Sequence, residues 1–208
     1  MADALAEGVR RAGVRRVVTL SSVGAHLPEG AGVVQGLHDM ERTFNALGVD
    51  VLHLRPTYFM ENLYGQIGSV RQMGAFAGAI RADLRFPIVH TADIAAVAAR
   101  RLLDGGWTGT QVEYVLGAED VDHRQAAQVL GAAIGRPEMD YVEISYADME
   151  RAFVGMGASP SVASRYAEFM RAMNDGRIME EARRTPENTT PTGLRDFAPQ
   201  FAAAYAAS

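Results

Sequence analysis

The sequence contains neither cysteine nor lysine, so its 20 Lys/Arg positions are all arginine. Without cysteine, the chain forms no disulfide, has no thiolate metal ligand and has no cysteine nucleophile. His90 and His123 lie far apart and do not have the spacing of a metal site, so no metal is expected. The lack of cysteine also suits a reducing compartment.

Long apolar runs and runs of like charge are missing as well. The longest uncharged apolar candidate is Ile94–Ala99, far shorter than the roughly 18 residues of a membrane-spanning helix. Residues 1–16 carry charges and no apolar core, a pattern unlike that of a signal peptide. A net charge of −5 and a pI near 5.5 argue against a nucleic-acid-binding surface. We expect a cytoplasmic protein that binds neither membranes nor nucleic acid.

The sequence does contain an alternation of strand-like and helix-like segments over residues 1–116. Short β-branched runs predict buried strands, and apolar residues spaced three and four apart predict helices. The predicted strands are Val14–Leu20, Val49–Leu54, Phe86–His90 and Val112–Leu116. The predicted helices are Ala2–Ala12, Gly36–Leu47, Asn62–Met73 and Thr91–Leu103. Pro56 is expected to lie beyond the second strand, because proline has no N–H to donate. Such alternation is typical of parallel strands joined by helices.

Beyond residue 116 the pattern is mostly helical. The predicted helices there are Asp122–Ile134, Ser145–Met156, Ser159–Met173 and Gly193–Ala207. A chain of 208 residues suits one domain, or one domain with a small appendage. We therefore predict a sheet-forming region over 1–116 and a helical cap region over 117–208.

Several segments carry a resemblance to a known family. They read GVRRVVTLSSVGA (13–25), HDMERTFNALGVDVLHLRPTYFMEN (38–62) and FPIVHTADIAAVAARRLL (86–103), with shorter pieces at 115–117 and 131–137. In this order and spacing the chain resembles the NmrA-like family, atypical relatives of the short-chain dehydrogenase/reductases. The resemblance implies an α/β fold: the C-terminal half of a Rossmann-like, doubly wound parallel sheet with a small helical cap. It also implies NAD(P)H as the cofactor.

The glycine-rich turn with which that family usually begins is not found. Such a turn lets the backbone approach the pyrophosphate at a helix N-terminus, whereas Gly30, Gly32 and Gly36 lie in a predicted loop. The sequence thus resembles an N-terminally truncated member, from a misplaced start or a gene fragment, and weak or no NAD(P)H binding is expected for this chain alone. The alternative is a genuine short protein that forms a homo-oligomer through the exposed edge of strand 17–20.

By resemblance, the residues directly after the first two strands face the nicotinamide. Open α/β sheets bind ligands at the carboxyl ends of their strands. The cofactor-binding candidates are Ser21, Ser22, Val23, Pro56, Thr57, Tyr58 and Phe59. Asn62 would touch substrate or cap the next helix. The alternative is that the serines only cap the strand end and that residues 56–62 form a packed loop.

The catalytic residue is not evident from the sequence. The wider superfamily carries a Tyr-x-x-x-Lys pair that supplies a proton, and this chain has no such pair. His38, in the corresponding helix, is a weak candidate because imidazole titrates near neutral pH. The alternative is a half-exposed helix histidine without a catalytic role.

Two functions remain open at this stage. The first is an NAD(P)H-dependent oxidoreductase, reductase-like, that acts on a small apolar or aromatic substrate near Tyr58, Phe59, Met149 and Phe153. The second is a non-catalytic NAD(P) sensor that binds a protein partner, and an inactive fragment is a third possibility. Both NAD and NADP remain open as the cofactor.

Overall fold

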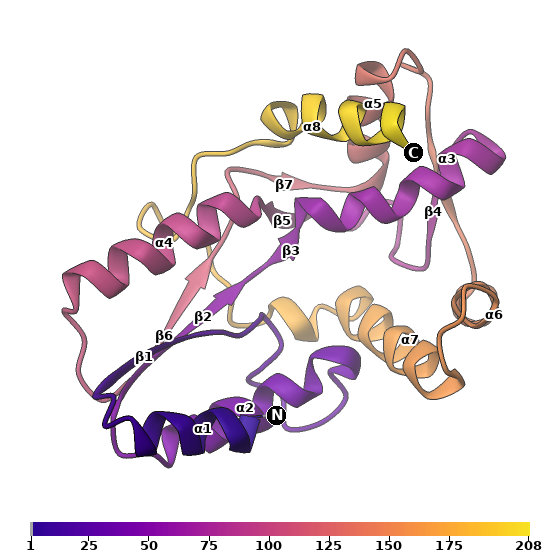
Figure 1. Ribbon diagram of the computed structural model, residues 1–208. Helices are drawn as coiled ribbons and strands as arrows, with labels where there is room; N and C mark the ends of the chain where they lie inside the picture. Colours follow the sequence, from indigo (N-terminus) through magenta and orange to yellow (C-terminus); the bar gives the residue numbers. More distant parts are fainter. Residues whose placement is uncertain (1) are drawn as a thin grey trace.

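The computed structural model describes residues 2–208, and its main sheet has three parallel strands in the order β1-β2-β6 (Figure 1). These are β1 (Arg16–Leu20), β2 (Asp50–Pro56) and β6 (Thr110–Val115). Both neighbours of β2 run parallel to it, with Val17 beside Val51 and Leu52 beside Gln111. The predicted α/β class and the parallel adjacency of the first two strands are confirmed.

The other elements form two smaller sheets and a set of helices. One small sheet has the order β3-β5-β7 and the other pairs β4 with β8. Their strands are β3 (Tyr58–Phe59), β4 (Phe76–Gly78), β5 (Phe86–Val89), β7 (Asp120–Val121) and β8 (Tyr141–Glu143). The α-helices are α1 (Ala2–Arg11), α2 (Gln35–Asn45), α3 (Ile67–Met73), α4 (Thr91–Asp104), α5 (His123–Ala133), α6 (Tyr146–Gly155), α7 (Pro160–Asn174) and α8 (Leu194–Ala207). Short 3-10 segments are η1 (Gly32–Val34), η2 (Met60–Gln66) and η3 (Arg177–Met179).

One face of the central strand β2 is apolar. Leu52 and Leu54 point into a buried cluster that includes Ile94 of α4 and Trp107. Alternate residues of a strand point to opposite faces of the sheet, so the side chains between them face the other way. Burial of these leucines therefore fixes α4 on one side of the sheet.

The opposite face of β2 is polar although it is equally buried. His53 is fully buried and its Nε2 donates to the amide oxygen of Asn45 on α2 at 2.8 Å. Arg55, two residues later, forms an ion pair with Glu41 of the same helix. Hydrogen bonds to buried charged partners, in addition to apolar packing, thus hold α2 against the sheet.

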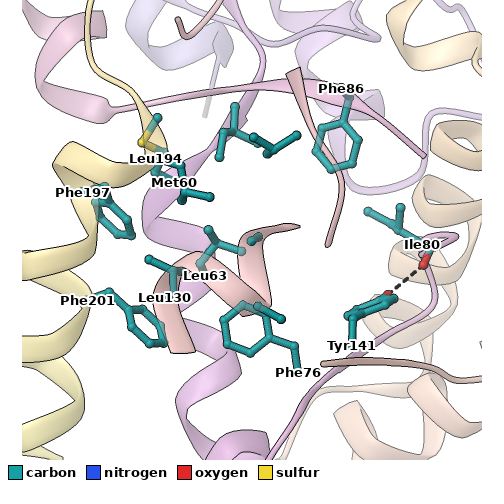
Figure 2. Close-up of a cluster of buried hydrophobic side chains, with 14 of the residues drawn as sticks. Met60, Leu63, Phe76, Ile80, Phe86, Leu130, Tyr141, Leu194, Phe197 and Phe201 are labelled. Atoms are coloured by element: carbon teal, nitrogen blue, oxygen red, sulfur yellow. Dashed lines mark hydrogen bonds between the residues drawn. The ribbon is translucent and has the colours of Figure 1, made fainter. Parts of the chain in front are cut away.

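A second, larger core lies between α8, α5 and the η2–α3 segment. Figure 2 shows its aromatic and aliphatic side chains pointing toward one another, with the Tyr141 hydroxyl donating to the carbonyl of Ile80 at 2.7 Å. Phe197 and Phe201 of α8 are fully buried there. This core anchors the end of the chain to the elements that directly follow β2.

Helix α7, which also pairs with α6, packs against the loop that follows β1. Gly32 of η1 lies so close to α7 that an added Cβ would sit 2.2 Å from the carbonyl oxygen of Arg165, and its φ is +60°. Both observations require glycine at this position. Among residues 2–208, no helix is long and apolar enough to cross a membrane.

The structure corrects the predicted elements at three points. The helix predicted over Asn62–Met73 begins as the 3-10 segment η2 and is α-helical only from Ile67. β2 continues through Pro56, which pairs with Val115 of β6, because proline at the end of a strand still accepts a hydrogen bond through its carbonyl. The region after residue 116 is not only helical. It contributes β7 and β8 to sheets whose other strands, β5 and β4, precede residue 116.

The outer edge of β1 generates a prediction about self-association. Within residues 2–208 no strand pairs with this edge, and Leu20 at its end is 56% exposed. An unpaired apolar edge favours pairing with another strand. We expect the chain to self-associate and Leu20→Lys to reduce that association, as measured by sedimentation velocity. Leu103→Lys, at a position that is 87% exposed on α4, is the control and should change nothing.

Candidate functional site

Backbone hydrogen bonds join the carboxyl ends of the three parallel strands. Beyond β1, the amide of Ser21 donates to Leu54 at 2.8 Å and that of Val23 donates to Pro56 at 3.0 Å. Beyond β2, the amide of Thr57 donates to Val115 of β6 at 3.1 Å. The two segments that the sequence predicts to face a cofactor therefore lie side by side at one edge of the sheet.

A buried ion pair lies beneath these strand ends. Arg55 donates from Nε and Nη2 to the two carboxylate oxygens of Glu41 at 3.0 and 2.7 Å, a bidentate arrangement. The Ser21 hydroxyl donates to the same carboxylate. Burial opposes the charged form of Glu41, but the hydrogen bonds from Arg55 and Ser21 and the positive charge of Arg55 together lower its pKa below the ordinary value.

The ion pair extends to the C-terminal part of the chain. After α7 the chain returns to the ends of β2 and β6 before it reaches α8 (Figure 1). There the Nη1 of Arg55 donates to the Tyr114 hydroxyl at 2.9 Å and to Glu181 at 3.1 Å. The Tyr114 hydroxyl in turn donates to Glu181. Burial and the hydrogen bond to Glu181 raise the pKa of Tyr114 to about 12, so the phenol stays neutral and donates.

Two polar side chains at the strand ends are buried without a partner. The Thr57 hydroxyl and both ring nitrogens of His26 have no hydrogen-bond partner in the described part of the chain. Leaving a buried donor or acceptor unpaired costs about 1–3 kcal/mol. The Thr57 hydroxyl and the His26 ring therefore hold unused hydrogen-bonding groups close to the strand ends.

Aromatic rings surround the segment after Thr57. The His123 ring lies 4.7 Å from that of Tyr141, and Tyr58 makes edge contacts with Phe86 and His123. A small cavity of about 10 Å³ is lined by Tyr58, Phe86, His123 and neighbouring apolar residues. Burial, with a smaller contribution from Tyr166 of α7, raises the pKa of Tyr58 to about 12. This end of the site is apolar and aromatic.

The structure places the predicted cofactor residues unequally. Ser21 is buried and its hydroxyl is bound to Glu41, whereas Ser22 is partly exposed and Val23 is buried. Pro56 belongs to β2, and Phe59 packs against the cluster of Leu52 and Leu54. Thr57 and Tyr58 lie at the strand end as the resemblance implies. The roles of these residues in cofactor binding stay predictions.

The predicted substrate residues lie farther from the strand ends. Asn62 is exposed on η2. Met149 is buried in a small cluster with Ala79 and Ala167, and Phe153 packs edge-on against Tyr166 at 4.8 Å. Met149 thus stabilises the packing of α6 on α7.

His38, the weak catalytic candidate, supports the loop after β1. Its Nδ1 donates to the carbonyl of Ala25 at 2.9 Å. This contact holds the backbone directly before His26, a residue that the sequence reasoning did not select.

Sequence reasoning also missed Glu41, Arg55, Tyr114 and Glu181 as parts of the site. Arg55 and Glu41 are 14 positions apart, and Arg55 and Glu181 are 126 apart. The available signal was the presence of an arginine inside an apolar strand, since a buried charge requires a partner. In residues 2–208, no three acidic or histidine side chains gather in a way that could hold a metal ion.

Comparison with known proteins places this arrangement in context. The chain is 28% identical over 208 residues to the NAD(P)H azoreductase of Xenophilus azovorans. This match covers 100% of the chain and 71% of the azoreductase. The NADPH-dependent quinone oxidoreductase of Escherichia coli, solved with NADPH, superimposes with a TM-score of 0.78 at 20% identity, over 96% of this chain and 70% of its own. The triphenylmethane reductase of Citrobacter sp. gives a TM-score of 0.67 at 17% identity, over 97% of this chain and 70% of the reductase. No family model matches the chain.

These relatives establish the fold and the kind of protein that the chain resembles. Its fold is that of Rossmann-like NAD(P)-binding reductases, and the chain spans about seven tenths of the length of each of the three proteins. The resemblance drawn from the sequence is confirmed at this level, because the similar proteins are NAD(P)H-dependent reductases.

The buried ion pair predicts a large loss of stability when one partner is removed. The side chains of Arg55 and Glu41 are 9% and 7% exposed. Arg55→Met leaves the carboxylate buried alone, so we expect a loss of about 3–5 kcal/mol in the free energy of unfolding, measured by urea titration. The double variant Glu41→Gln/Arg55→Met should recover part of this loss. Arg10→Met, in the exposed pair with Glu7, is the control and should cost less than about 1 kcal/mol.

His123 predicts a pH dependence of stability. Burial among aromatic rings lowers its pKa to about 4, so between pH 6.5 and 4 the unfolded chain binds the proton that the folded chain does not. Stability should fall by about 3 kcal/mol as the pH drops through this window. His123→Phe should flatten the curve of unfolding free energy against pH there. An unchanged slope in the variant would show that other groups cause the dependence.

Proposed function

We propose that this chain is an NAD(P)H-dependent reductase of the NmrA-like kind, which delivers a hydride to a small apolar or aromatic acceptor at the carboxyl ends of β1 and β2. The observation that carries the proposal is the pair of buried, unpartnered groups, the Thr57 hydroxyl and the His26 imidazole, at the ends of neighbouring parallel strands. A bound dihydronicotinamide would supply the hydride, and the residues of the chain bind and orient it.

We propose distinct roles for the side chains near the strand ends. Thr57 offers a hydroxyl to the carboxamide of the nicotinamide, and Val23 provides an apolar wall beside it. Tyr58 and the aromatic rings around it favour a flat apolar acceptor, because aromatic pairs stack or meet edge to face. The similar proteins are named for azo, quinone and triphenylmethane acceptors, which are molecules of this chemical class.

The binding of the phosphates is a separate matter. Glycine-rich turns after a strand present backbone amides to a pyrophosphate, and no such turn follows a strand in this sequence. We propose that residues 1–208 alone hold NADPH with a dissociation constant weaker than micromolar. A dihydronicotinamide without phosphates, such as 1-benzyl-1,4-dihydronicotinamide, therefore tests whether the strand ends bind the nicotinamide ring by itself.

Thr57→Val separates a ligand-binding role from a structural one. Valine has a similar shape and removes the unpartnered hydroxyl, so we expect the free energy of unfolding to rise by about 1 kcal/mol. We expect the same variant to bind 1-benzyl-1,4-dihydronicotinamide more weakly, because the carboxamide loses its partner. Urea titration and fluorescence titration measure the two effects. A stabilised variant with unchanged binding would remove Thr57 from the site.

Turnover distinguishes a reductase from a non-catalytic sensor. The chain should accelerate the reduction of 2-methyl-1,4-naphthoquinone by 1-benzyl-1,4-dihydronicotinamide above the rate in buffer. Binding without acceleration would favour the sensor. The absence of both binding and acceleration would refute the proposal.

A further inference from the structure

We infer that His26 is the proton donor of this site and that Glu181 is the residue that positions its imidazole. The inference rests on the proposed function, since a reductase that delivers a hydride to a carbonyl carbon or to a quinone must also supply a proton to the oxygen that gains negative charge.

The position and burial of His26 single it out. It lies in the loop after β1, three residues beyond Val23, whose amide is hydrogen-bonded to Pro56 at the end of β2. Its side chain is 13% exposed, and both ring nitrogens are shielded from solvent without a partner in residues 2–208. Buried polar atoms in native proteins are nearly always hydrogen-bonded. A ligand that enters beside the loop would supply the missing partner.

Two of the other four histidines, one in α2 and one in β2, already hydrogen-bond to neighbouring groups of the protein. His38 donates to the carbonyl of Ala25. His53 is fully buried between Thr19, 2.6 Å from its Nδ1, and Asn45, 2.8 Å from its Nε2. Neither ring is placed to give a proton to a ligand.

The remaining two histidines are held in the second core. The Nδ1 of His90 accepts from the amide of Ala92 at 3.0 Å and caps α4, while its Nε2 lies 3.3 Å from Gln200. The His123 ring lies 4.7 Å from that of Tyr141 at an interplanar angle of 31°, and burial lowers its pKa to about 4, so the imidazole is uncharged at neutral pH. His26 is thus the histidine left available at the strand ends.

Glu181 is fixed beside His26 by groups that are themselves fixed. Its Oε2 lies 4.0 Å from the Nδ1 of His26 and accepts from Arg55 at 3.1 Å and from the Tyr114 hydroxyl. Arg55 in turn is held by Glu41 on both carboxylate oxygens. A carboxylate that orients an imidazole and stabilises its protonated form is the recurring arrangement for proton transfer by histidine. Catalytic contacts are often longer before the ligand binds.

The exposure of Glu181 completes the proton path. Its side chain is 50% exposed, whereas the nitrogens of His26 are buried. The proton therefore has a route from solvent along Glu181 to the imidazole, and from there to the ligand.

The proposed step balances in atoms and charge. A dihydronicotinamide transfers a hydride, two electrons and one proton, to a quinone and becomes the nicotinamide cation. Protonated His26 gives one proton to the oxygen that has gained negative charge, so the product is the hydroquinone. Neutral His26 then regains a proton from solvent beside Glu181, with no further oxidant or reductant.

The experiment measures turnover of 2-methyl-1,4-naphthoquinone with 1-benzyl-1,4-dihydronicotinamide by the wild type, His26→Ala, His26→Gln and Glu181→Gln. We expect both His26 variants to lose about 100-fold in kcat with little change in the KM for the quinone, and added imidazole to restore part of the rate of His26→Ala. Glu181→Gln should lose less. Glu180→Gln, an exposed neighbour, is the matched control and should behave as the wild type.

A second readout does not depend on turnover. In histidine labelled with ¹⁵N, the ring signals of His26 should shift when 2-methyl-1,4-naphthoquinone is added. Glu181→Gln should alter the same signals without the quinone, and Glu180→Gln should not. Unaltered signals in Glu181→Gln would overturn the positioning role of that residue.

The outcomes separate this inference from the function on which it rests. A wild-type chain that does not accelerate the reaction overturns the proposed function, and the proton-donor role with it. An active wild type with equally active His26 variants overturns the proton-donor role alone. Loss of kcat in the His26 variants, with rescue by imidazole, supports both.

Discussion

The bidentate ion pair between Arg55 and Glu41 is the interaction on which the candidate site depends. Both charges are buried, and a buried charge is tolerated only when it is paired and hydrogen-bonded. Arg55 meets this requirement by joining the central strand to α2 through Glu41 and to the C-terminal segment through Glu181. The same guanidinium thus holds together three parts of the chain that are far apart in sequence.

The need to pair these buried charges explains the hydrogen bonds on the polar face of the sheet. The Ser21 hydroxyl donates to Glu41, and this hydrogen bond links the segment directly after β1 to α2. Tyr114 is kept neutral, with a pKa raised to about 12, so its hydroxyl accepts from Arg55 and donates to Glu181. What remains free above the ion pair is the Thr57 hydroxyl and the His26 imidazole. These two unpartnered groups lie next to an otherwise apolar and aromatic region.

Much of the fold follows from local patterns in the sequence. The strands β1 and β2 were predictable from β-branched and leucine-rich runs, and their parallel pairing from the helix between them. The strands β3 and β7 have two residues each, too few to show a period, and they depend on pairing with β5. The extension of β2 to Pro56 was not predictable from the sequence alone. It depends on the pairing of Pro56 with Val115 of β6, where the strand needs no N–H from the proline.

The candidate site was less predictable than the fold. The residue types after β1 and β2 indicated where a ligand would lie, but not which side chains are free to meet it. The hydroxyl of Ser21, a predicted cofactor-binding residue, is bound to Glu41, 20 positions away, and no local sequence pattern indicates this contact. Met149 belongs to the packing of α6 on α7, which periodicity alone does not distinguish from a pocket lining. The role of Glu181 depends on the return of the chain after α7, a long-range contact without a local signal.

The central claim is that a nicotinamide head binds at the carboxyl ends of β1 and β2, above the Arg55–Glu41 pair. Backbone amide NMR of the ¹⁵N-labelled chain, titrated with 1-benzyl-1,4-dihydronicotinamide, tests it most directly. The claim predicts saturable shifts concentrated at Ser22, Val23, Thr57 and Tyr58, with the amides of α6 and of the amino ends of the strands unchanged. Shifts confined to other parts of the chain, or no saturable shift at these four residues, would contradict it.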